Sequence, residues 1–254
     1  MIITRFSRLI REYHRLAAGD VFVGQVPSSF LKSALLADLC DRGIRLVPSA
    51  TAQVLNASKV AQAFLLNPWM VPHTFAITRR RELLDAISTY NELGVSSAVT
   101  KADCLHCGHG VRKWDNLEIL YSCLAFDEKA FPLVIQPHVD DFSDIRVVIA
   151  GDYIEAYSRS NPHNFRKNMA VGGHSASHML SAAEEKFCRA IMQRAGMPYA
   201  HLDLMRLPDG AIFCLEIRLN GGIQGARIER RALEKLKQAR LQELTEGDIS
   251  GIGP

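Results

Sequence analysis

The order of the predicted secondary-structure elements constrains the fold more than any other feature of this chain. Residues 20–26 are typical of a buried strand, residues 33–40 of a helix that ends at Gly43, and residues 44–47 of a second strand, which together make a compact β-α-β unit. The second half of the chain instead predicts antiparallel hairpins, because short turns join its strands. These hairpins pair residues 145–149 with 153–158 and residues 201–206 with 211–217, and a helix over 177–194 lies between them. This order predicts an α+β protein.

Composition argues against several classes of protein. A chain of 254 residues, 48% of them hydrophobic, can bury a sizeable core without disulfide bonds, and its six scattered cysteines favour reduced thiols. Its longest apolar runs fall far short of the ~20 residues that a membrane span needs, so we expect a cytoplasmic protein with no membrane partner. With 30 basic and 27 acidic residues, the net charge of +3 does not call for a nucleic-acid partner. The sequence leaves open whether the chain forms a homo-oligomer.

The stretch KADCLHCGHGV, residues 101–111, admits two interpretations. In the first, its two cysteines and two histidines hold zinc. Structural zinc sites commonly use two separated ligand pairs, however, and a short loop can hardly wrap four ligands around one ion, so general zinc geometry disfavours this interpretation. In the second, Lys101 ends a strand, and Gly108 and Gly110 let backbone N–H groups approach phosphate oxygens closely.

Two carboxylates in the second half of the chain suggest a magnesium site. Asp203 and Glu216 lie on the strands that the Pro208-Asp209-Gly210 turn joins, and Lys59 lies on a helix predicted over residues 56–66. Carboxylate oxygens from paired strands suit Mg²⁺, which binds through one or two carboxylates together with substrate phosphates. Taken in isolation, carboxylates at such a hairpin are also typical of a solvated surface.

Several motifs follow one another in an order that is typical of one superfamily. After the Lys101 loop come Asp144-Ile-Arg146-Val, Gly151-Asp152, Arg159-Ser-Asn-Pro, Phe165-Arg-Lys-Asn168 with Gly172-Gly173, Leu202-Asp203-Leu, Asp209-Gly210, and Leu215-Glu216-Ile with Asn220-Gly221. In this combination the chain, from about Ile44 to Arg227, resembles the ATP-grasp superfamily. Within it the chain is similar to the carboxylate–amine ligases related to ribosomal-protein glutamate ligase and glutathione synthetase. The resemblance implies an ATP-grasp fold, in which two α+β subdomains clasp ATP.

The resemblance also implies a contact for each part of ATP. Lys59 and Lys101 would bind the phosphates, under a loop that contains Gly108 and Gly110. Adenine would lie against a hinge over residues 134–139, whose backbone can pair with the base. The central hinge residues are Gln136, Pro137 and His138. The ribose hydroxyls would be reached by Asp140 or Asp141.

For catalysis, the resemblance implies a metal end and a group of arginines. Asp203 and Glu216 would hold Mg²⁺ (or Mn²⁺) that bridges the phosphates. Arg159 would face the oxyanion that develops when an acyl phosphate is formed and attacked. The other residues of this group are Arg146, Arg166 and Asn168.

Two positions depart from the family pattern. The residue two after the metal-binding glutamate is usually asparagine, whereas it is Arg218 here, and a guanidinium cannot bind a cation. Either Asn220 supplies the missing oxygen, or one metal ion is lost and Arg218 replaces its charge. Pro137 stands where the hinge often has glutamate, which removes an N–H donor and leaves the carbonyl. The first unit is also short, since only 58 residues precede Lys59.

The sequence therefore predicts three units: a short N-terminal α/β unit over residues 1–52, a small ATP-grasp subdomain over 53–136 and a C-terminal subdomain over 137–254. The leading hypothesis is an ATP- and Mg²⁺-dependent ligase that phosphorylates a small carboxylate and joins it to an amine, a thiol or a peptide. The alternative is an ATP-binding protein without turnover that acts as a regulatory or scaffold subunit, which Arg218 favours. A metal or nucleic-acid module built on residues 104–109 would leave residues 130–225 unexplained.

Overall fold

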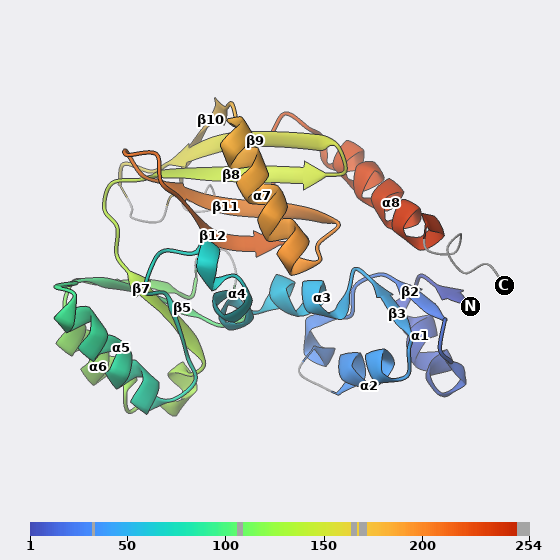
Figure 1. Cartoon of the computed structure of the whole chain (residues 1–254), viewed down its shortest axis with the longest axis horizontal. Coiled ribbons are helices and arrows are strands. Elements are labelled where there is room, and N and C mark those ends of the chain that lie inside the picture. Colours follow the sequence, from blue (N-terminus) through green and yellow to red (C-terminus); the bar gives the residue numbers. More distant parts are fainter. Residues whose placement is uncertain (32–33, 106–108, 164–166, 168–171, 248–254) are drawn as a thin grey trace.

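The computed structural model describes residues 1–31, 34–105, 109–163, 167 and 172–247, which form three β-sheets (Figure 1). The first sheet is parallel and contains β1 (Ile2–Ile3), β2 (Val21–Val23) and β3 (Arg45–Val47) in that order. Between its strands lie α1 (Phe6–Glu12), η1 (Tyr13–Arg15), η2 (Ser28–Phe30) and α2 (Leu35–Asp41). The predicted β-α-β unit is therefore present, and β1 extends its sheet by one strand.

The second sheet is small, antiparallel and covered by two helices. Its strands are β4 (Phe75–Ile77), β7 (Leu133–Pro137), β5 (Ala98–Ala102) and β6 (Val111–Trp114), in the spatial order β4-β7-β5-β6. Its helices are α5 (Arg80–Glu92), α6 (Leu117–Leu124) and the 3₁₀ turn η4 (Glu128–Ala130), and α5 and α6 lie together on one side of the sheet in Figure 1. Leu83 and Tyr90 of α5 and Leu120 of α6 pack against Ile135 of β7, so this sheet has a core of its own.

The third sheet is the largest and carries most of the residues that the sequence analysis singled out. Its strands are β10 (His174–His178), β9 (Tyr153–Ser160), β8 (Ser143–Ala150), β11 (Tyr199–Arg206) and β12 (Ile212–Arg218), all antiparallel and in that spatial order. Successive side chains of a strand point to opposite faces. Val147, Ile149 and Leu202 therefore join Cys188 and Ile191 of α7 (Ala182–Ala195) in the core, while Arg146 and Asp203, at alternate positions, point to the opposite face.

Helix α7 begins later than the sequence predicts. Residues 177 and 178, which we expected in this helix, pair with β9 as the end of β10. The helix is capped by Ser181, whose hydroxyl accepts a hydrogen bond from the Glu184 N–H while the Glu184 carboxylate accepts one from the Ser181 N–H. This capping box satisfies two of the backbone donors that a helix leaves open at its start, so the helix begins there.

Two short helices connect the three sheets. In place of the single helix predicted over 56–66, the structure has α3 (Ala50–Ala57) and α4 (Lys59–Leu65), because Ser58 leaves the helical conformation and caps α4 through the Ala61 N–H. Leu55 of α3 lies in the core of the large sheet, and Val54 packs against the core of the N-terminal unit. Helix α4 contacts β12 as well as β4 and β7, and η3 (Asn67–Trp69) follows it.

The last helix, α8 (Arg230–Gly247), returns to the N-terminal sheet. It contacts β8 of the large sheet and both β2 and β3 of the N-terminal sheet. Figure 1 shows α8 running from the large sheet toward the N-terminus of the chain. Within the described residues, no helix is both long and apolar enough to cross a membrane.

A buried carboxylate anchors the segment between β12 and α8. Glu155 of β9 is 5% exposed and accepts hydrogen bonds from the Arg227 N–H (2.7 Å), the Arg227 Nε (3.1 Å) and the Ile228 N–H (3.2 Å), and from the Tyr153 hydroxyl. Burial raises the pKa of Glu155, but the hydrogen bonds from Tyr153 and Arg227 outweigh it and hold that pKa below its ordinary value. Glu155 therefore fixes the path of the chain that follows β12.

We expect Glu155→Ala to lower the free energy of unfolding by about 2–4 kcal/mol, because the Arg227 and Ile228 N–H groups lose their acceptor. The difference in stability between wild type and variant should shrink in acid. Because the pKa of Glu155 is lower in the folded protein than in the unfolded chain, its stabilising effect is complete above the unfolded-state pKa and is lost as the pH falls through the folded-state pKa. Urea denaturation at neutral and acidic pH measures both effects. Arg227→Ala, whose side chain is 82% exposed, is the control and should cost less than about 1 kcal/mol. Equal losses for the two variants would contradict the anchoring role.

Candidate nucleotide and metal site

A row of polar side chains crosses the large sheet on the face away from α7. Strand register places Tyr157 of β9 opposite Arg146 of β8, Arg146 opposite Asp203 of β11, and Asp203 opposite Glu216 of β12. Directly paired residues in a sheet point to the same face, so these four side chains are neighbours. The two carboxylates that the sequence analysis paired across the Pro208-Asp209-Gly210 turn thus lie side by side.

Asp203 is held by two arginines. Arg146 binds both of its oxygens, with Nε 2.5 Å from Oδ1 and Nη2 3.1 Å from Oδ2. Arg159 of β9 places Nη2 3.0 Å from the same Oδ1 and also donates two hydrogen bonds to Asp144. Asp144, Arg159 and Asp203 are each less than 10% exposed, so the group is a buried ion network.

The network changes how these groups titrate. Burial alone would raise the pKa of Asp203, but Arg146 and Arg159 outweigh it and hold that pKa below its ordinary value. Burial raises the pKa of Asp144 to about 6, against the attraction of Arg159. Asp203 is therefore charged at neutral pH. The Arg159 guanidinium forms an ion pair with Asp203 in this structure. That Arg159 also faces a developing oxyanion stays a prediction.

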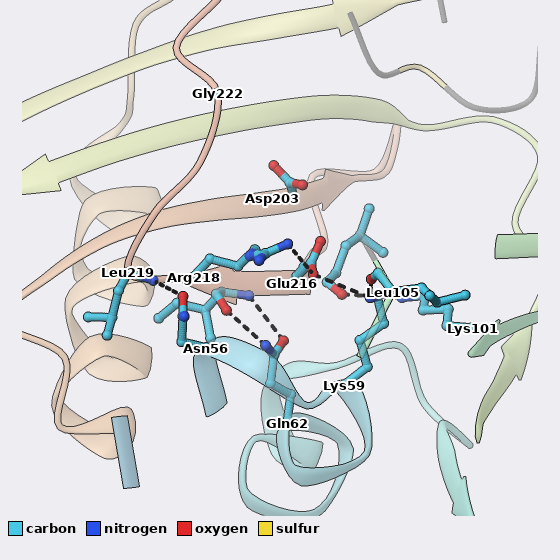
Figure 2. A network of polar contacts seen from close by, with 12 residues as sticks. Asn56, Lys59, Gln62, Lys101, Leu105, Asp203, Glu216, Arg218, Leu219 and Gly222 are labelled. Carbon is cyan, nitrogen blue, oxygen red and sulfur yellow. Dashed lines mark hydrogen bonds and ion pairs between the residues drawn. The ribbon is translucent and has the colours of Figure 1, made fainter. Parts of the chain in front are cut away.

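Glu216 is less committed than Asp203. Its Oε1 lies 3.6 Å from the Lys59 Nζ and 3.8 Å from the Arg218 Nη1, and Figure 2 shows these cations on two sides of the carboxylate. Both separations exceed hydrogen-bond length, so the attraction is electrostatic and the oxygen lone pairs stay accessible to a further cation. The Glu216 side chain is 24% exposed.

Two lysines reach this carboxylate from different parts of the fold. Lys59 is the first residue of α4, and its Nζ also donates to the Leu105 carbonyl in the loop between β5 and β6. Lys101, on β5 of the small sheet, donates from Nζ to the Leu215 carbonyl of β12, 3.2 Å away. Burial lowers the pKa of Lys101 to about 8, against the attraction of Glu216. The predicted phosphate-binding lysines therefore converge on the predicted metal ligand.

The loop after β5 is packed closely at Gly110. A Cβ built there would lie 2.9 Å from the Ala102 Cβ and 3.0 Å from the Leu105 Cδ1, so only glycine fits without a shift. Asp103 accepts a hydrogen bond from the Val60 N–H, which joins the loop to the start of α4. Gly108, the other predicted loop glycine, and Cys107 lie outside the described residues. Predicted residues Arg166 and Asn168 also lie outside them.

The predicted adenine hinge ends strand β7. Gln136 and Pro137 pair with Val99 and Ala98 of β5, and the His138 N–H continues this pairing to the Ser97 carbonyl, 3.0 Å away. On the other side of β7, β4 pairs only as far as Ile135. The hinge thus extends past its neighbour, which is the geometry that lets a strand edge pair with a base. The His138 Nδ1 lies 3.2 Å from the Oδ1 of Asp140, the predicted ribose contact, whose side chain is 85% exposed.

Asn220 has partners away from the carboxylate pair. Its Nδ2 donates to the Gln25 Oε1 at 3.0 Å, and its Oδ1 accepts a hydrogen bond from the Lys237 Nζ at 3.2 Å. A role as metal ligand, which stays a prediction, would require this oxygen to leave Lys237. Among the described residues, no group of three or more His, Cys, Asp or Glu side chains is arranged to hold a metal ion.

Sequence analysis missed the side chains that hold β12 in place. Gln62 of α4 donates from Nε2 to the Ile217 carbonyl (2.8 Å) and accepts from the Ile217 N–H (3.1 Å), while Asn56 accepts from the Leu219 N–H (2.9 Å) (Figure 2). These bonds substitute for a neighbouring strand at the edge of the sheet. The only sign of this role in the sequence is that Gln62 interrupts the apolar residues of a short helix, and this pattern does not identify the strand that Gln62 binds.

Comparison with known proteins identifies the family. The model of the RimK-like ATP-grasp domain matches residues 56–236, well over half of the chain. The chain belongs to this family. The α+β ATP-grasp fold predicted from the motifs is thereby confirmed. No sequence among the curated proteins matches the chain.

Solved structures support the same fold. D-cycloserine synthetase DcsG superposes with a TM-score of 0.64 at 14% identity, over 88% of this chain and 84% of that chain. D-alanine–D-alanine ligase from Bacillus anthracis, complexed with ATP, gives 0.64 at 14% identity, over 95% and 84%. The ATP-grasp ligase PsnB, complexed with precursor peptide PsnA2 and AMPPNP, gives 0.57 at 16% identity, over 89% and 79%. At these identities the likeness shows the ATP-grasp fold and leaves the substrates open.

The pKa of Lys101 makes nucleotide affinity depend on pH. Its ammonium is present below about pH 8 and is lost above it, so we expect the Kd of MgATP to rise by up to about tenfold per pH unit above 8. Lys101→Arg keeps the charge and should give a nearly flat profile, and Lys129→Arg, on the small subdomain's η4, is the control that keeps the wild-type profile. Calorimetry across pH 7 to 9.5 measures this. The same slope in wild type and Lys101→Arg would remove Lys101 from the phosphate site.

Proposed function

We propose that this protein is an ATP- and Mg²⁺-dependent ligase that joins a carboxylate to an amine, or a thiol, through an acyl phosphate. The observation that carries the proposal is the convergence of Lys59, Lys101 and the Asp203–Glu216 pair, which come from a connecting helix and two separate sheets. A solvated surface hairpin would not gather buried lysines around its carboxylates. Family membership supports the same chemistry.

The electrostatics of the site suit a triphosphate. Basic side chains outnumber acidic ones where these elements meet: the former are Arg146, Arg159, Lys59 and Lys101, and the latter Asp144, Asp203 and Glu216. The excess of positive charge sits partly buried, where it attracts anions more strongly than it would in water. It complements the net negative charge that a magnesium–ATP complex carries.

The carboxylate pair fits one Mg²⁺. Two carboxylates are the number that Mg²⁺ uses when phosphates supply further ligands, and the Glu216 oxygens accept no hydrogen bond from any described residue. Asp203 and Glu216 would hold the ion, with Arg146 and Arg159 keeping Asp203 charged and oriented. When bound, Mg²⁺ would neutralise phosphate charge and polarise the transferred phosphoryl group.

The residues of the chain then bind and orient the reactants. Lys59 and Lys101 offer their ammonium groups to phosphate oxygens, and the loop that contains Gly110 covers them and excludes water. A carboxylate oxygen of the substrate bonds to the γ-phosphorus as the bond to ADP breaks. The amine nitrogen then bonds to the acyl carbon, loses a proton and displaces phosphate.

The second candidate is an ATP-binding protein without turnover. The specific observation in its favour is the Arg218 guanidinium, 3.8 Å from Glu216 at the position where the family usually has a neutral metal ligand. If Arg218 replaced the metal charge altogether, ATP would bind equally well without Mg²⁺. The two candidates therefore differ in the metal dependence of nucleotide binding.

We expect Mg²⁺ to tighten ATP binding in the wild type and Glu216→Gln to remove most of this effect, with a loss of about tenfold or more in affinity at saturating Mg²⁺. Calorimetric titration of ATP with and without Mg²⁺ measures it, together with release of ADP in the presence of pooled acids and amines. Glu92→Gln, an exposed neutralisation at the end of α5, is the matched control and should behave as wild type. ATP binding that ignores Mg²⁺ in the wild type, with no acid- or amine-dependent ADP release, would favour the second candidate.

A further inference from the structure

A cavity of about 210 Å³ lies between the N-terminal unit and the ATP-grasp body. One side is the loop after β2, with Gln25, Ser28 and Leu31, and the other is the end of α3, with Asn56 and Ala57. Arg218 at the end of β12 also lines it. Glu216 precedes Arg218 by two residues on the same strand, so the cavity adjoins the proposed metal and phosphate site.

The walls of this cavity are fixed by hydrogen bonds. Gln53 of α3 is 2% exposed, accepts from the Val26 N–H at 2.7 Å and donates to the Pro48 carbonyl at 2.8 Å. Gln25 is held by Asn220 on one side and by the Tyr199 hydroxyl on the other. The loop after β2 therefore has a defined position against α3 before any ligand arrives, as small-molecule sites usually do.

Two of the polar side chains that line the cavity, those of Asn56 and Arg218, offer hydrogen-bond donors. Asn56 uses its Oδ1 to accept the Leu219 N–H, which orients its Nδ2 donors away from that bond. Arg218 carries a planar guanidinium whose N–H groups match the two oxygens of a carboxylate. Among the described residues that line the cavity, Arg218 is the charged one and no carboxylate is present. Such a lining attracts an anion.

We propose that this cavity binds the carboxylate of the acid substrate, with Arg218 as its anchor and Asn56 as a second donor. The inference rests on the proposed ligase function and names the substrate class: a free acid of about amino-acid size. The volume lies below the roughly 300–1,000 Å³ of pockets for drug-sized ligands, so it suits a small acid better than several residues of a peptide. Arg218 would thus act on the substrate rather than on the nucleotide, which gives a reason for arginine at a position where a metal ligand is usual.

Binding can be tested without turnover. The melting temperature of the full chain is measured with single probes: the proteinogenic amino acids, acetate, succinate, citrate and trialanine, each with and without MgATP. We expect at least one amino-acid-sized acid to raise the melting temperature of wild type, and Arg218→Gln to abolish this rise while MgATP still stabilises the variant. Arg194→Gln, on the exposed end of α7, is the matched control and should respond as wild type. No response of wild type to any small acid, or a response to trialanine alone, would overturn the proposal.

Turnover gives a second and independent readout. Hydroxylamine replaces the amine, so that an activated acid is trapped as its hydroxamate with release of ADP and phosphate. We expect Arg218→Gln to raise the KM for the acid by about ten- to a hundredfold, with the KM for MgATP changed by less than about threefold. Arg218→Lys should recover only part of this, because a lysine cannot bind a carboxylate through two parallel bonds. A raised KM for MgATP with an unchanged KM for the acid would show that Arg218 binds phosphate, and would overturn the proposal.

Two further variants guard against misfolding of the arginine variants. Asn56→Asp keeps the acceptor for the Leu219 N–H and adds a negative charge, so it should weaken acid binding in a folded protein. Ala57→Leu narrows the cavity and should exclude the larger acids first. Wild-type affinity for the acid in both variants would overturn the proposal. Acid binding that needs Arg218, with no hydroxamate formed from any acid, would support the cavity assignment and reject the ligase function. Hydroxamate formation that does not depend on Arg218 would support the ligase function and reject the cavity assignment.

Discussion

The arrangement of the site depends on the buried ion network around Asp203. Two arginines contact this carboxylate, and one of them, Arg159, also binds Asp144. Removing one partner from a buried ion group costs about 3–5 kcal/mol, because the remaining charge is left uncompensated, so these residues can be buried only together. Since they come from the neighbouring strands β8, β9 and β11, the network also fixes strand register, and register in turn places Glu216 of β12 beside Asp203.

The edge of the large sheet is the second constraint. Strand β12 has no neighbouring strand on its outer side in the described sheet, and exposed edge groups are open to unwanted pairing. Gln62 and Asn56 bind backbone groups of this edge, so α3 and α4 hold the strand that carries Glu216 and Arg218. Helix α3 also lines the cavity, and α4 supplies Lys59. Nucleotide site and cavity consequently share one rigid strand, which suits a reaction that transfers a group between two bound molecules.

The sequence predicted those parts of the site that local structure controls. A short turn joins the strands of Asp203 and Glu216, so the sequence predicted that these two strands pair, and the ordered motifs identified the ATP-grasp fold. A register shift between Asp203 and Leu204, which the turn does not predict, then places Glu216 opposite Asp203. The contacts of Asn220 show the limit of this reasoning. Its spacing after Glu216 suggested an oxygen ligand, whereas its carboxamide contacts Gln25, 195 residues away, and Lys237. Spacing along the chain cannot show which distant element approaches a side chain.

What the sequence by itself determined was the type and order of the elements and the chemistry available to them. Turn residues, helix caps and the alternation of apolar residues act within a few residues, so they can be read from one segment at a time. Tertiary structure decided which of these groups meet: that Lys101 reaches β12 across 114 residues, that Arg159 binds Asp203, and that Arg218 borders a cavity at the N-terminal unit. The physical reason is that periodicity marks a face as apolar or polar without naming the face that packs against it, and only the packing of three sheets around α3 and α4 settles that choice.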